Sequence, residues 1–194
     1  MDILKTLANA VETCARVIVW GVGLQEGTRK ALVADLQEIC IKCEAAYDAV
    51  LARLVPVKSA FGDPVNLARE LRDFAADGAT RDQFKPEHLC SQIDHLLVRL
   101  SSHLDPLKYA VDFRRITDLQ RSFSQLGHFD GAIFRAYDEL VVQLDRIATD
   151  IQGSGGDGME RSRYAQHVVQ DFEDDLRVAL NAVRDTKSRL VGLI

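Results

Sequence analysis

The chain of 194 residues contains four cysteines and five histidines, the residue types best suited to redox or metal chemistry. Cys40 and Cys43 form a C-x-x-C pair, a spacing used by redox-active dithiols and by many zinc sites. The pair lies in the middle of an expected helix with no strand before it, and no second pair of ligands with zinc-site spacing follows. Cys43 also falls on the apolar stripe of that helix. We therefore expect both thiols to be reduced and packed in a core, without metal or cofactor.

The histidines are scattered along the chain, and none has the i, i+4 partner that places two metal ligands on one helical face. Their expected environment is a surface or a boundary. They are His88, His95, His103, His128 and His167.

An arginine followed at short distance by a histidine is a second candidate for chemistry. Arg121 with His128 and Arg161 with His167 have this pattern in a chain expected to be helical. The pattern resembles the ribonuclease signature of HEPN-type helical domains. The resemblance implies that histidine acts as general acid or base at a ribose hydroxyl and that arginine stabilises phosphate charge. A HEPN-like ribonuclease or antitoxin-type domain is therefore one alternative function.

Two charged segments are candidate interaction sites, and each is also compatible with a solvated helix face. One is basic, the other is acidic, and the two could pair with one another within the fold. The basic segment contains Lys108, Arg114, Arg115 and Arg121, and the acidic segment contains Asp171, Glu173, Asp174 and Asp175.

The overall composition excludes several classes of protein. With 47% apolar residues, 12 glycines and 4 prolines, the chain is neither disordered nor collagen-like. The net charge of -5 gives no general attraction to nucleic acid, so no nucleic-acid partner is expected. The cysteine usage and the lack of a readable signal peptide predict a cytoplasmic protein.

Apolar residues recur every three or four positions almost throughout, which indicates helices. The stripes predict helices over about 2–20, 27–55, 64–78, 107–126, 130–151 and 159–192, with another between Pro86 and Pro106. Pro56 is expected to end the second helix, and Asp63 with Pro64 to start the third. The fold class predicted is all-α: an elongated bundle of about six to seven helices, several of them long and nearly antiparallel.

A glycine-rich segment over 153–158 separates a bundle at 1–152 from a long helix at 159–194. Its composition predicts a flexible linker. Met159 follows it directly, which leaves two interpretations open. The linker is a native hinge, with the last helix packing on the bundle, or it is a joint to a fused or second-start helix.

The beginning of the chain is its most hydrophobic segment, but charged residues interrupt it before it reaches the length of a membrane span. Its arrangement before long helices resembles the first helix of HeLo-type cell-death domains, which implies a membrane-acting signalling bundle with peripheral membrane contact. The stripe that would meet a membrane or a partner contains Ile3, Leu7, Val11, Ile18 and Trp20.

The regular apolar stripes, the mixed charges and the lack of a readable catalytic signature favour a non-catalytic helical module. We expect an interaction or regulatory domain, such as a signalling scaffold, that acts through helix faces on a protein partner or by self-association. The membrane-acting bundle and the HEPN-like domain remain the alternatives.

Overall fold

The computed structural model describes residues 8–9, 11–12, 14–16, 18–19, 25–83, 95–96, 98–99, 102, 129–153 and 158–191. Apart from short turns, these residues are helical, and none of them belongs to a strand. The all-α class predicted from the apolar spacing is therefore confirmed.

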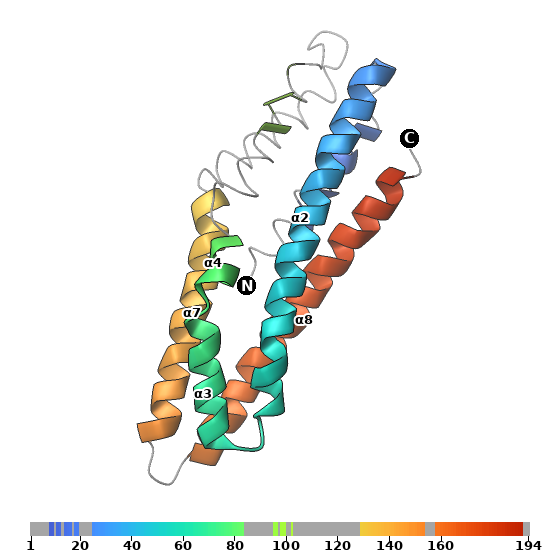
Figure 1. The fold of residues 1–194 in the computed structure, drawn as a ribbon. Coiled ribbons are helices and arrows are strands. Elements are labelled where there is room, and N and C mark those ends of the chain that lie inside the picture. Colours follow the sequence, from blue (N-terminus) through green and yellow to red (C-terminus); the bar gives the residue numbers. More distant parts are fainter. Residues whose placement is uncertain are drawn as a thin grey trace.

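Five helices are continuous within the described ranges (Figure 1). They are α2 (Glu26–Ser59), α3 (Pro64–Ala75), α4 (Gly78–Gln83), α7 (Phe129–Gly153) and α8 (Gly158–Val191). The predicted helices at 27–55, 130–151 and 159–192 are confirmed as α2, α7 and α8. With 34 residues each, α2 and α8 are about 50 Å long.

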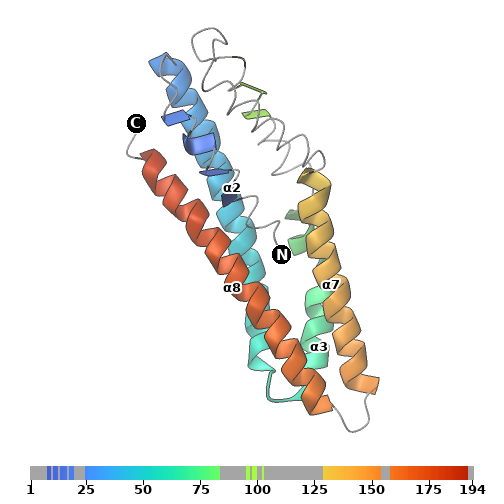
Figure 2. The ribbon, with the colours of Figure 1, turned by 180° about the vertical axis from the view of Figure 1, so that it is seen from behind.

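The helices pack as two antiparallel pairs (Figures 1 and 2). α2 packs chiefly on α8, and α3 packs chiefly on α7. Both connections between the pairs, from α2 to α3 and from α7 to α8, lie at the same end of the molecule, drawn at the bottom of Figure 1. α8 therefore has its most extensive contact with a helix that precedes it by about 100 residues rather than with its neighbour in sequence.

Apolar stripes on α2 and α8 form most of the shared core. On α2 the stripe is two residues wide, because Val33, Cys40 and Tyr47 lie beside Leu32 and Ile39 on the buried side. A stripe of this width can contact two neighbouring elements at once. The buried apolar residues of α8 are Ala165, Val169, Phe172, Leu176, Ala179, Leu180, Val183 and Leu190.

Ion pairs reinforce the contact between α2 and α8 at its edges. The Arg184 Nη2 atom lies 2.9 Å from Asp48 Oδ2, and Lys187 Nζ lies 2.8 Å from Glu44 Oε2. Arg184 and Lys187 belong to α8, while the two carboxylates belong to α2. Because all four side chains are partly exposed, each pair contributes at most about 1 kcal/mol, and they act mainly to define how the helices align.

The prediction that Pro56 ends the second helix is wrong, because α2 continues to Ser59. Proline lacks one N–H and so removes a single hydrogen bond near the end of the helix. The last turn still buries Val57, whose side chain is 1% exposed, and it brings Lys58 to α8. These contacts compensate for the missing bond.

The predicted start of α3 is confirmed. The Asp63 Oδ1 atom accepts hydrogen bonds from the backbone N–H groups of Val65 and Asn66, and Pro64 occupies the first turn. The predicted end near Gly78 is wrong, since α3 ends at Ala75 and Gly78 begins α4. The carboxylate of Asp77 accepts a hydrogen bond from the Ala79 N–H and thereby caps this second, shorter helix.

Candidate interaction surface

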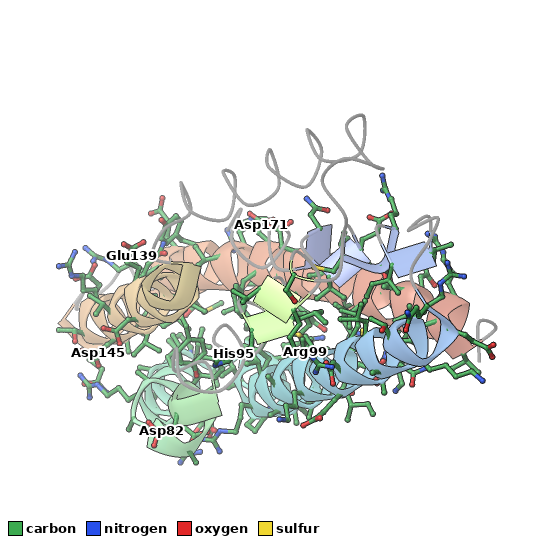
Figure 3. All side chains as sticks on the ribbon, turned by 90° about the horizontal axis from the view of Figure 1, so that it is seen from above. Asp82, His95, Arg99, Glu139, Asp145 and Asp171 are labelled. Carbon is green, nitrogen blue, oxygen red and sulfur yellow. The ribbon has the colours of Figure 1, made fainter. Side chains whose placement is uncertain are left out.

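The outer side of α8 carries a row of exposed side chains at alternating spacings of four and three residues. This row lies opposite the buried stripe of the helix, because each residue turns the helix by about 100°. Figure 3 shows its central member, Asp171, on the side of α8 that faces away from α2. We call this row the α8 ridge. Its members are Glu160, Tyr164, His167, Asp171, Asp174 and Val178.

The α8 ridge combines apolar surface with charge. Tyr164 and Val178 are 57% and 58% exposed. Asp171 and Asp174 lie between them in sequence and are also exposed. Arg163 flanks the ridge near its start. Within the described part of the chain, neither these two aspartates nor Arg163 takes part in an ion pair.

Glu173 belongs to the same acidic segment but lies on the inner side of α8, where its side chain is 10% exposed. Its carboxylate is 2.7 Å from the Lys58 Nζ of α2, and it accepts two hydrogen bonds from the Arg177 guanidinium. Burial raises the pKa of Glu173, but the hydrogen bonds and charges of Lys58 and Arg177 outweigh burial and hold it below its usual value. This carboxylate therefore links two helices and is not available to a partner.

The acidic segment is thus divided between two sides of α8. Asp171 and Asp174 face solvent on the ridge, and Asp175 is half-buried beside it. Within this segment, Glu173 forms ion pairs with Lys58 and Arg177. The basic residues Lys108, Arg114, Arg115 and Arg121 lie outside the described residues, as does His128.

The remaining arginine–histidine pair is separated around the axis of α8. Arg161 and His167 are six positions apart, so their side chains leave the helix about 120° apart. The Arg161 Nη1 atom lies 3.3 Å from Asp150 Oδ2 of α7. Because His167 points to solvent on the ridge, the two side chains do not converge on one substrate position.

The N-terminal stripe is buried wherever the structure describes it. Val11 and Ile18 are 0% exposed and belong to the same core cluster as α2 and α8. A membrane or a partner would meet these two residues only if the helix left the core. Ile3, Leu7 and Trp20 lie outside the described residues. Among the described helices, none is long and apolar enough to cross a bilayer.

Three cysteines lie in the core as free thiols: Cys14, Cys40 and Cys43. Burial raises the pKa of Cys14 and of Cys40 to about 12, and it raises the pKa of Cys43 as well. The thiolate, which is the reactive form and the metal-binding form, is therefore strongly disfavoured. No group of three potential metal ligands occurs among the residues that the structure describes. These findings agree with the expected packing role of the C-x-x-C pair.

A hollow of about 200 Å³ lies between α2 and residues 95–99. Its wall includes the exposed His95 and Arg99, both labelled in Figure 3. Arg99 forms an ion pair with Asp35 of α2, which also lines the hollow. Because the arginine and the aspartate already neutralise one another, the hollow offers a ligand little unsatisfied charge.

Four of the six ridge residues had no interaction role predicted from the sequence, and these are Glu160, Tyr164, His167 and Val178. The signal was present in the sequence, since these positions alternate by four and three like the buried stripe, but on the polar side of the helix. Comparison of the chain with protein-family models, with curated proteins and with solved structures finds no match.

Proposed function

We propose that this chain is a non-catalytic interaction module of the cytoplasm that binds protein through the exposed face of α8. In this proposal the whole chain forms an elongated bundle of about six to seven helices. Residues 1–152 and the long helix at 159–194 form one packed unit, and the linker at 153–158 is a native hinge.

The α8 ridge is the observation that carries the proposal. A helix face that only needs to be soluble is usually covered with lysine and glutamate, whose long chains remain mobile. The ridge instead presents Tyr164 and Val178 with a histidine and two exposed aspartates between them. Tyrosine is enriched at protein interfaces because it buries a large area and loses little conformational entropy. Residues of this kind at four-three spacing suit a partner that is itself helical.

The charged and apolar side chains of the ridge indicate which side chains a partner would need. Asp171 and Asp174 lack ion pairs within the described residues, so a partner with basic side chains at its centre would supply the missing charge. The apolar side chains of Tyr164 and Val178 would contact apolar residues at either end. The expected partner is therefore an amphipathic helix with basic residues between apolar ones.

Site-specific photo-cross-linking in cells tests this proposal. A benzophenone amino acid replaces Tyr164 on the ridge, and in a matched control it replaces Val65, which is 74% exposed on α3. We expect a discrete protein adduct from position 164 and none from position 65. The adduct should disappear when Asp171→Lys and Asp174→Lys are added, because the ridge then repels a basic partner. Equal adducts from both positions, or no adduct from position 164, would contradict the proposal.

A further inference from the structure

We draw no further inference here: the strongest candidate, the outward face of α2, where the small and apolar residues Ala31, Ala34, Ile41, Ala45, Ala52 and Val55 are exposed, is a helix face for which nothing in the part of the chain that the structure describes shows what covers it.

Discussion

At Glu173, a carboxylate that is largely withdrawn from water is held by a lysine of α2 and an arginine of its own helix. Its hydrogen bonds to Lys58 and Arg177 join the last turn of α2 to the middle of α8. Asp174, the next residue, has turned by about 100° and lies in solvent. Two adjacent acidic residues therefore have different roles because the helix directs one inward and the other outward.

Replacing Glu173 with glutamine keeps the size of the side chain and removes its charge. We expect Glu173→Gln to lower the free energy of unfolding by about 1 to 2 kcal/mol near neutral pH, because bonds from charged donors are weakened. The partial exposure of Lys58 and Arg177 keeps the effect below that of a fully buried ion pair. Urea denaturation measures the change. Asp174→Asn is the matched control and should change stability by less than about 0.5 kcal/mol.

The stability difference between wild type and Glu173→Gln should also depend on pH. The pKa of Glu173 is lower in the folded chain than its usual value of 4.5, so ionisation stabilises the fold above that value. The contribution is lost as the pH falls through the lower, folded pKa. The stability difference between wild type and Glu173→Gln should stay constant from about pH 7 to 5 and shrink below about pH 4.5. A difference that persisted unchanged in strong acid would assign it to packing rather than to charge.

At the scale of the elements, the start of α3 depends on one side chain. The Asp63 carboxylate accepts from the Val65 N–H at 3.0 Å and from the Asn66 N–H at 3.2 Å. These are two of the N–H groups that a helix cannot satisfy internally. Because α3 packs along α7, this cap helps to hold one of the two helix pairs together.

We expect Asp63→Ala to destabilise the chain by about 1 kcal/mol, since alanine cannot accept these hydrogen bonds. Asp63→Asn should retain most of the stability because its amide oxygen replaces the carboxylate oxygen as acceptor. Thermal and urea denaturation of the three proteins provide the comparison. A loss in Asp63→Asn as large as that in Asp63→Ala would show that negative charge at the helix start, rather than hydrogen bonding, is the stabilising feature.

Helices and their caps could be predicted from the sequence where they depend on residues close together in the chain. The cap at Asp63 and the stripes of α2, α7 and α8 depend on residues a few positions apart, and all of them were predicted from the sequence. The continuation of α2 past Pro56 could not be, because it depends on the burial of Val57 and on the contact of Lys58 with a residue 115 positions away. The inward orientation of Glu173 also required knowledge of its distant partner.

At the scale of the whole molecule, α8 is packed into the core. It shares a buried stripe with α2 and forms cross-helix ion pairs with Asp48 and Glu44. The pairing of α2 with α8 could not be predicted, because the aliphatic stripes of the long helices resemble one another. Which stripe meets which depends on shape and on the sum of many small contacts.

We therefore expect the folded protein to survive cleavage between α7 and α8. A protease site replaces the linker at 153–158, and the cleaved protein is analysed by size-exclusion chromatography. Both pieces should elute together, because the α2–α8 contact does not require a covalent connection. In a variant with Arg184→Glu and Lys187→Glu, like charges face Asp48 and Glu44, so cleaved α8 should dissociate at lower urea concentration. Immediate separation of the wild-type pieces would show that the linker itself holds α8 in place.

The pairing of α2 with α8 also has a consequence for the order in which the protein is made. The ribosome completes α2 more than 100 residues before it completes α8. At a synthesis rate of roughly 5 to 20 residues per second, the apolar stripe of α2 lacks its contact with α8 for on the order of ten seconds. During that interval Cys40, Cys43 and the apolar residues around them are open to oxidants and to other nascent chains. The arrangement that shields these thiols in the finished protein thus makes them most vulnerable during its synthesis, when chaperones would have to take the place of α8.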